Sequence, residues 1–204
     1  MPMSSNLKFT LGIVAAAVIG VAAAAVIFSP DEQPLAHTQG EVALVEFLDF
    51  QCGPCGAAFP NVERVRKEYG GRITYTAKMF PIPSHRHAQA TARAALAAGN
   101  QGRFDDMYRK LFETQAVWSP LGADQAAATF AGYARELGLD MKRYQADVAS
   151  GDTGKRITAD VDQGIAAGVN GTPTFFINGK RFTGSPTYDG LKAAIDAELA
   201  KVAQ

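Results

Sequence analysis

The sequence predicts an α/β domain in which a β-α-β unit, a block of helices and a β-β-α unit follow one another along the chain. Residues 42–50 are rich in β-branched and aromatic side chains and apolar on both faces, as in a central strand, and a helical pattern follows them. Apolar residues then recur three or four positions apart from residue 84 to about residue 168. Asn178 and Gly179 separate two short apolar runs, which predicts a hairpin.

Size and charge are those of one ordinary domain. The chain has 204 residues, of which 47% are hydrophobic, enough for one well-packed domain with an appendage. Its 20 Lys and Arg residues balance 20 Asp and Glu residues, without a long run of one sign. Nucleic-acid-binding domains normally show a clustered basic excess, so we expect no nucleic-acid partner.

Residues 9–28 carry no charge, and Lys8 precedes them while Asp31 and Glu32 follow. At about 1.5 Å per residue, a helix of this length can cross a hydrocarbon core about 30 Å thick. The flanking charges orient its N-terminus toward the cytoplasm. We therefore predict one N-terminal transmembrane helix. The small residues at 22–25 leave a cleaved secretory signal as the alternative.

Both interpretations place the rest of the chain outside the cytoplasm, where disulfide chemistry is permitted. Residues 1–28 are then the membrane anchor or signal, residues 29–41 a polar linker with two prolines, and residues 42–204 the domain. We expect a cell-membrane location with the domain on the periplasmic or cell-wall side, or secretion if the signal is cleaved.

Local patterns predict the elements of the domain. A helix is expected over residues 53–71 and a second strand over residues 72–80, and a right-handed crossover would make the two strands parallel. The amphipathic pattern of Leu191, Ile195 and Leu199 predicts a closing helix.

The helical block also carries capping signals. Asp124, Asp140 and Thr153 are the predicted N-caps, and Gly138 and Gly168 the predicted helix ends. The apolar stripes of these helices are expected to pack as a core, and Trp118 with them.

The only two cysteines, Cys52 and Cys55, lie where the first strand passes into the first helix. A zinc site needs four Cys or His ligands, so it would require His85 and His87 to fold onto the pair, and we predict no metal. A disulfide across two residues closes too small a loop to stabilise the fold much. These arguments favour a redox pair.

Position supports that reading. Cys52 is expected at the helix N-terminus, where unpaired N–H groups and the helix dipole favour a thiolate. Cys55, one turn further in, would be more buried and would resolve a mixed disulfide. Pro54 is tolerated in the first helical turn because its missing N–H would have had no partner there.

The segment VEFLDFQCGPCGAAFP resembles the active-site strand and helix of the thioredoxin superfamily. Glu46 stands six residues before Cys52, where the superfamily has a buried acid, and Pro60 matches its helix-kinking proline. The resemblance implies that Glu46 assists proton transfer at Cys55. The alternative is an edge-facing glutamate on a half-exposed strand.

A second landmark is VNGTPTFFINGK, in which Thr172-Pro173 resembles the superfamily's cis-proline loop. The resemblance implies that this loop faces the cysteines and binds an extended substrate through Thr172 and Pro173, whereas an ordinary turn proline would be trans. The helical insertion at about 84–168 resembles the DsbA-like branch. The implied fold is a thioredoxin fold, with a central mixed sheet flanked by helices and an inserted all-helical subdomain.

The resemblance implies an extracytoplasmic thiol:disulfide oxidoreductase that forms disulfides in cysteine-containing exported proteins. A quinone-linked DsbB-type or VKOR-type membrane oxidase would reoxidise it, and no cofactor is needed because the dithiol carries both electrons. Gly53 and Pro54 are typical of reducing thioredoxins rather than of the strongly oxidising Pro-His type. A tethered disulfide reductase is therefore one alternative, and a peptide-binding chaperone module is another. His85 and His87 are expected to be solvated loop residues, although a histidine here could also tune the nucleophile.

Overall fold

The computed structural model describes residues 42–202. The transmembrane helix predicted at residues 9–28 and the linker predicted at residues 29–41 lie outside this range. Within residues 42–202, no helix is both long enough and apolar enough to span a bilayer.

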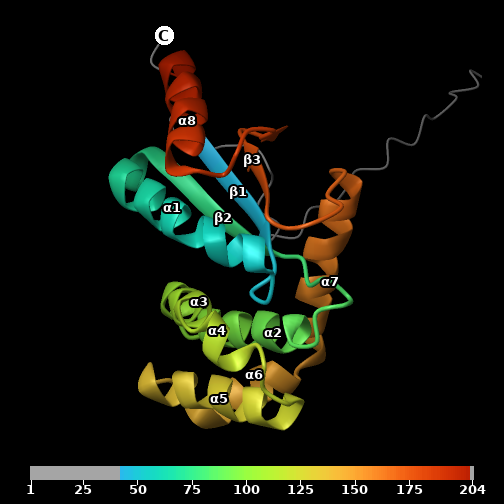
Figure 1. Ribbon diagram of the computed structural model, residues 1–204. Coiled ribbons are helices and arrows are strands. Elements are labelled where there is room, and N and C mark those ends of the chain that lie inside the picture. The colour runs from blue at the N-terminus through green and yellow to red at the C-terminus, as the bar shows by residue number, and fades with distance from the viewer. Residues whose placement is uncertain (1–41, 203–204) are drawn as a thin grey trace, which may run out of the picture. The chain divides into compact units, whose positions relative to one another are not determined.

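A four-stranded mixed sheet forms the centre of the domain, in the strand order β2-β1-β3-β4 (Figure 1). The strands are β1 (Val42–Leu48), β2 (Ile73–Met79), β3 (Thr174–Ile177) and β4 (Lys180–Arg181). Strand β1 pairs in parallel with β2 and antiparallel with β3, and β3 pairs antiparallel with β4. All seven residues of β1 are buried, which confirms the prediction of a central, two-sided strand.

Helices α1 (Gly53–Tyr69) and α8 (Tyr188–Val202) cover one face of the sheet, and a short 3₁₀ turn, η1 (Gly70–Arg72), joins α1 to β2. One apolar cluster joins these helices to the sheet; it includes Leu44, Val62, Phe175, Leu191 and Ile195.

Helix α7 (Gly151–Ala166) packs against the other face of the sheet. At Gly164, a Cβ atom would lie 2.8 Å from the Phe80 ring and 3.0 Å from the Phe47 ring. The absence of a side chain at Gly164 therefore lets α7 approach the aromatic side chains beneath it.

The helical insertion lies between β2 and β3, as predicted. It comprises α2 (Ala88–Gly99), α3 (Phe104–Glu113), α4 (Gln115–Trp118), α5 (Ala123–Glu136), α6 (Met141–Ala149) and α7. Figure 1 shows α2 to α6 gathered beyond the N-terminal end of α1. Trp118 is fully buried there and donates its indole N–H to the Leu111 carbonyl at 2.9 Å, which confirms its packing role.

The predicted N-caps are correct at one of three helices. The Asp140 side chain accepts the Arg143 N–H and caps α6. Helix α5 begins at Ala123, so Asp124 already lies in its first turn. The Ser150 side chain caps α7 instead of Thr153, because it accepts the N–H of Asp152 and starts that helix three residues earlier than predicted.

The predicted turn glycines are confirmed. Gly138 and Gly168 have φ values of 73° and 77° where helices α5 and α7 end. Asn178 and Gly179 have φ values of 48° and 72° between β3 and β4, the backbone that a tight hairpin turn requires.

Candidate active site

The two cysteines lie at the start of α1, where the chain leaves the central strand. Cys52 is the N-cap residue, its N–H donates to the Asp49 carbonyl at 3.0 Å, and its own carbonyl accepts the Gly56 N–H at 3.1 Å. Both cysteines are thiols in this structure. Cys52 is 6% exposed and Cys55 is fully buried, while Gly53 and Pro54 between them are exposed. A partner can therefore approach Cys52 but not Cys55.

The loop before β3 lies against Cys52. The Thr172-Pro173 peptide bond is cis, as predicted, and the Cys52 thiol donates to the Thr172 carbonyl at 3.2 Å. The Thr172 hydroxyl is buried, and no hydrogen-bond partner for it is found among residues 42–202. The structure thus brings Cys52 together with Thr172 and Pro173. The hydrogen bond between Cys52 and Thr172 joins residues that are 120 positions apart in sequence.

The surroundings of Cys52 favour its thiolate. The hydrogen bond from the Cys55 thiol is the largest cause that lowers the pKa of Cys52 to about 6, although burial and the charge of Asp49 oppose the shift. Cys55 behaves in the opposite way: burial raises the pKa of its thiol far above the usual range, and its hydrogen bond to Cys52 and the charge of Glu46 act in the same direction. Near neutral pH, Cys52 is therefore the thiolate of the pair.

Glu46 lies in the middle of β1 and is fully buried, so it is not an edge-facing side chain. Its Oε2 accepts the Tyr75 hydroxyl at 2.6 Å, whereas its Oε1 is buried and has no partner among the described residues. Burial raises the pKa of Glu46 to about 7, against the hydrogen bond from Tyr75 and the charge of Arg66. Glu46 can therefore gain or lose a proton near neutral pH beside the buried Cys55.

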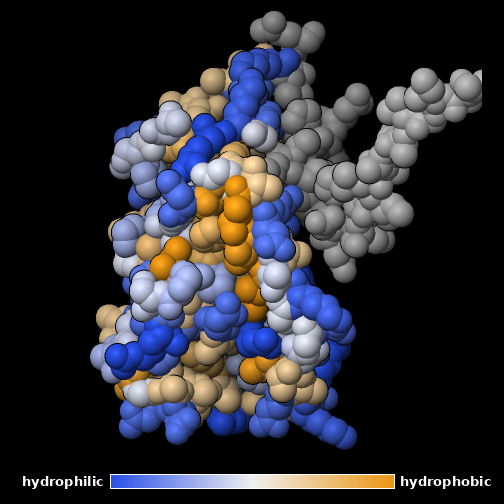
Figure 2. Space-filling view, turned by 90° about the vertical axis from the view of Figure 1, so that its right-hand side faces the viewer, coloured by the Kyte–Doolittle hydropathy of each residue, from blue (hydrophilic) through white to orange (hydrophobic). Residues whose placement is uncertain are grey.

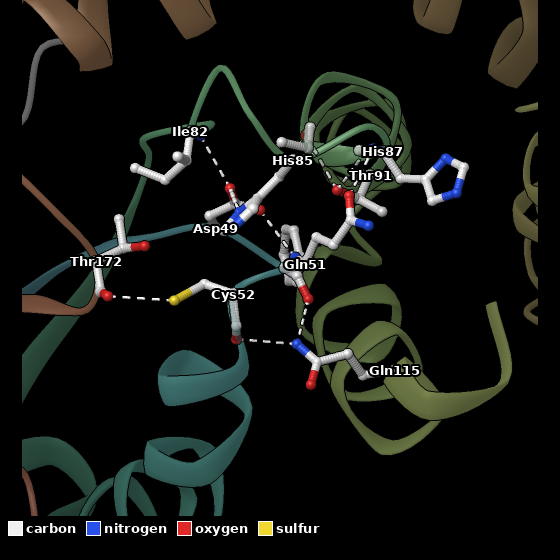
Figure 3. A network of polar contacts seen from close by, with 11 residues as sticks. Asp49, Gln51, Cys52, Ile82, His85, His87, Thr91, Gln115 and Thr172 are labelled. Atoms are coloured by element: carbon white, nitrogen blue, oxygen red, sulfur yellow. Dashed lines mark hydrogen bonds and ion pairs between the residues drawn. The ribbon is translucent and has the colours of Figure 1, made fainter. Parts of the chain in front are cut away.

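Sequence reasoning missed a polar network around Asp49 (Figure 3). The Asp49 carboxylate accepts the Gln51 N–H at 2.8 Å through Oδ1, and its Oδ2 lies 2.9 Å from the Ile82 nitrogen and 2.7 Å from His85 Nδ1. The Asp49 side chain is 0% exposed. It therefore ties the loop that carries Cys52 to the segment that follows β2.

The prediction that both loop histidines are solvated is wrong. His87 is buried: its N–H donates to the Gln51 side chain at 2.6 Å, and its Nε2 lies 2.9 Å from the Leu121 carbonyl. The His85 side chain is 31% exposed, and its Nδ1 is hydrogen-bonded to Asp49. The polar partners of both residues come from segments distant in sequence, so the local pattern gave no sign of their burial.

A third contact comes from the insertion. The Gln115 side chain, on α4, donates through Nε2 to the carbonyls of Phe50 at 2.7 Å and Cys52 at 3.0 Å. These bonds fix the backbone on both sides of Gln51, just before α1 begins. A glutamine in a four-residue helix carries no sequence signal for this role.

Over residues 42–202, no group of three or more His, Cys, Asp or Glu residues is arranged to hold a metal ion.

Comparison with known proteins agrees with this geometry. The family model described as thioredoxin matches residues 34–197. The chain belongs to the thioredoxin family. Among solved structures, a thioredoxin-like oxidoreductase from Silicibacter pomeroyi DSS-3 is 26% identical, with a TM-score of 0.65 over 78% of this chain and 87% of that one.

The inserted helices give this thioredoxin-family chain a DsbA-like fold. The oxidoreductase DsbA from Xylella fastidiosa matches with a TM-score of 0.66 at 20% identity, over 84% of this chain and 91% of that one. At this level of identity the likeness is one of fold. The predicted mixed sheet with an inserted helical subdomain is thereby confirmed.

Curated relatives of the thioredoxin-family region are much longer proteins. The Na(+)/H(+) antiporter NhaA 1 of Salinispora arenicola (strain CNS-205) is 37% identical over 163 residues, which are 79% of this chain and 24% of the antiporter. The chain thus spans about a quarter of the length of the curated relatives it matches.

Proposed function

We propose that this domain catalyses thiol–disulfide exchange through Cys52 and Cys55, and that it works as an extracytoplasmic oxidase of cysteine pairs in exported proteins. The observation that carries the proposal is the opposite state of the two sulfurs. Cys52 is exposed at its edge with its pKa lowered to about 6, and Cys55 is buried with its pKa raised. A dithiol enzyme needs one defined sulfur, which attacks a partner when the pair is reduced and is attacked when the pair is a disulfide.

In the oxidase direction, the enzyme begins with a Cys52–Cys55 disulfide. A substrate thiolate attacks the sulfur of Cys52, the Cys52–Cys55 bond breaks, and Cys55 leaves with the electron pair. A second substrate thiolate then attacks the substrate sulfur of the mixed disulfide and displaces Cys52 as a thiolate. The substrate loses two electrons and the enzyme gains them, so no cofactor is required.

The buried acid has a role at the first of these steps. Cys55 leaves into surroundings that disfavour a thiolate, since burial raises its pKa. Glu46 has a pKa of about 7, and its Oε1 has no partner within the described part of the chain. It is therefore suited to give a proton to the Cys55 sulfur and to take it back when the enzyme is reoxidised.

An extended segment of the client would lie along Thr172 and Pro173, beside the exposed edge of Cys52. Figure 2 shows the face that carries α7 and the loop after β2, where hydrophobic atoms form a band between hydrophilic flanks. On α7, Ile165 is 61% exposed. An unfolded client offers apolar side chains to such a surface.

The same pKa values favour the oxidase direction of electron flow. A dithiol whose reduced form is stabilised by a low-pKa thiolate gives its disulfide away more readily. Gly53 and Pro54 place no cation between the cysteines, which favours a tethered disulfide reductase as the second candidate.

Location and partners belong to the proposal as well. The uncharged residues 9–28 would anchor the chain in the membrane, near a DsbB-type or VKOR-type oxidase that reoxidises the pair. Ion exchange, named for the much longer antiporter relatives, is not part of the proposal.

The test uses reduced, unfolded ribonuclease A as the client and the oxidised full chain as the enzyme. Cys52→Ser is expected to abolish client oxidation, because it removes the attacked sulfur. Cys55→Ser is expected to trap a mixed disulfide between Cys52 and the client when it is started from a Cys52 mixed disulfide with glutathione. Client oxidation by the Cys52→Ser variant would contradict the proposal. Faster reduction of an oxidised client than oxidation of a reduced one would select the reductase.

A further inference from the structure

The Asp49 carboxylate is buried three residues before Cys52, and the Asp49 carbonyl accepts the Cys52 N–H at 3.0 Å. Three groups face Cys52 in the described structure: the Cys55 thiol from α1, Thr172 from the loop before β3, and Asp49 from the loop after β1. The charge of Asp49 disfavours the Cys52 thiolate, since like charges repel across a poorly solvated interior. Any group that offsets the Asp49 charge therefore stabilises that thiolate.

His85 is placed to do so. Its Nδ1 lies 2.7 Å from Asp49 Oδ2, on the same oxygen that accepts the Ile82 N–H (Figure 3). Because an ionised carboxylate only accepts hydrogen bonds, Nδ1 carries the hydrogen. The His85 side chain is 31% exposed, whereas the carboxylate it contacts is 0% exposed. Protonation of the ring turns the hydrogen bond into an ion pair and offsets the charge of Asp49.

We propose that His85 is a positioning residue that sets the reactivity of Cys52 through Asp49. It brings, from the segment after β2, an imidazole to the buried carboxylate near Cys52, whereas Gly53 and Pro54 place no basic side chain between the cysteines. When the imidazole is charged, the His85–Asp49 pair is close to neutral and the Cys52 thiolate is more stable. A neutral donor in place of His85 leaves the charge of Asp49 without that offset.

The inference rests on the proposed function only in taking Cys52 as the reacting sulfur. It makes the redox equilibrium of the pair depend on a residue 33 positions away in sequence, through an acid at the end of β1. A purely structural role would be different: His85 would hold Asp49, and thus the Ile82 backbone, without changing the chemistry of Cys52.

Substitution of His85→Gln separates the two roles, because glutamine keeps an N–H donor for Asp49 and removes the charge. Arg86→Gln is the matched control, since it removes a cation from the neighbouring exposed position. The apparent pKa of Cys52 is read from thiolate ultraviolet absorbance of the reduced full chain, and the redox equilibrium from exchange with glutathione at about pH 6.

His85→Gln is expected to raise the apparent Cys52 pKa by about half to one unit. Because Cys52 is only about half ionised at pH 6, the equilibrium constant for disulfide transfer to glutathione should fall by about 1.5- to twofold. Arg86→Gln is expected to change both quantities by less. In an Asp49→Asn background, His85→Gln should no longer move the Cys52 pKa. If Asp49→Asn does not fold, the comparison of His85→Gln with Arg86→Gln still decides the question.

The inference is overturned if His85→Gln leaves the Cys52 pKa and the glutathione equilibrium unchanged, including the case in which it lowers only the melting temperature. It is also overturned if Arg86→Gln has an equal effect. Both quantities are measured without a protein client, so a chain that fails to oxidise ribonuclease A yet shows the His85 shift would contradict the proposed function and leave this inference standing.

Discussion

Glu46 and Asp49 are both buried acids near the end of β1, but their surroundings differ. Asp49 has three hydrogen-bond donors shared between its two oxygens. Glu46 has a single hydroxyl donor, and its other oxygen has no partner within residues 42–202. The donors to Asp49 join two segments of the chain, whereas burial raises the pKa of Glu46 to about 7. Asp49 therefore organises the site, whereas Glu46 can exchange a proton near neutral pH.

The two cysteines follow the same division. Cys52 belongs to the polar side, where Asp49 and Gln115 hold its backbone and the Thr172 carbonyl accepts its thiol. Cys55 belongs to the interior side, where burial and the charge of Glu46 raise the pKa of its thiol. The sulfur that meets the client and the sulfur that resolves the disulfide are thus separated by their surroundings, although only two residues lie between them.

The largest effect is expected at Glu46, through the pH dependence of stability. Its folded pKa, about 7, lies above its ordinary value of 4.5, so its contribution to stability is full at low pH and is lost as the pH rises toward 7. Glu46→Gln removes this loss. From about pH 5 to about pH 8, we expect the unfolding free energy of the native chain to fall by about 2 to 3 kcal/mol relative to that of the variant.

The measurement is urea unfolding of the oxidised protein at both pH values, because neither cysteine titrates in that form. Glu113→Gln, at an exposed position on α3, is the control and should follow the native chain. If the unfolding free energy of Glu46→Gln changes with pH in the same way as that of the native chain, Glu46 is not an acid that titrates between these pH values.

A smaller effect is expected at Gln115, which belongs to the polar side. Gln115→Ala leaves the carbonyls of Phe50 and Cys52 without their side-chain donor, and we expect a loss of about 1 to 2 kcal/mol of unfolding free energy. Gln101→Ala is the matched control, since Gln101 also makes two hydrogen bonds to the main chain, at Asp140, but in an exposed position. If urea unfolding shows an equal loss of unfolding free energy for the two variants, the hydrogen bonds from Gln115 stabilise the chain no more than those of an exposed glutamine.

Features set by short stretches of sequence could be predicted. The central strand, the helix that starts at the cysteines and the Asn178-Gly179 hairpin each follow from a local pattern, and the structure has all three. The cis bond before Pro173 did not follow from the local pattern; it was expected only from the resemblance to a known superfamily, and the structure shows it.

Features set by contacts between distant segments could not be predicted. The partner of Gln115 lies 63 to 65 residues away, and the partner of His85 lies 36 residues away. A histidine or glutamine in a loop gives no sign of which distant backbone it will meet, so His87 was expected to be solvated and is buried. The same holds for Asp49, whose donors come from two segments of the chain.

The most direct test of the division between the two sulfurs is site-resolved alkylation of the reduced chain. A small dose of iodoacetamide is added at about pH 7. This pH lies above the pKa of Cys52, about 6, and far below the pKa of Cys55. Mass mapping should find Cys52 labelled at least about tenfold more than Cys55, because the thiolate is the nucleophile. Equal labelling, or more label on Cys55, would contradict the account.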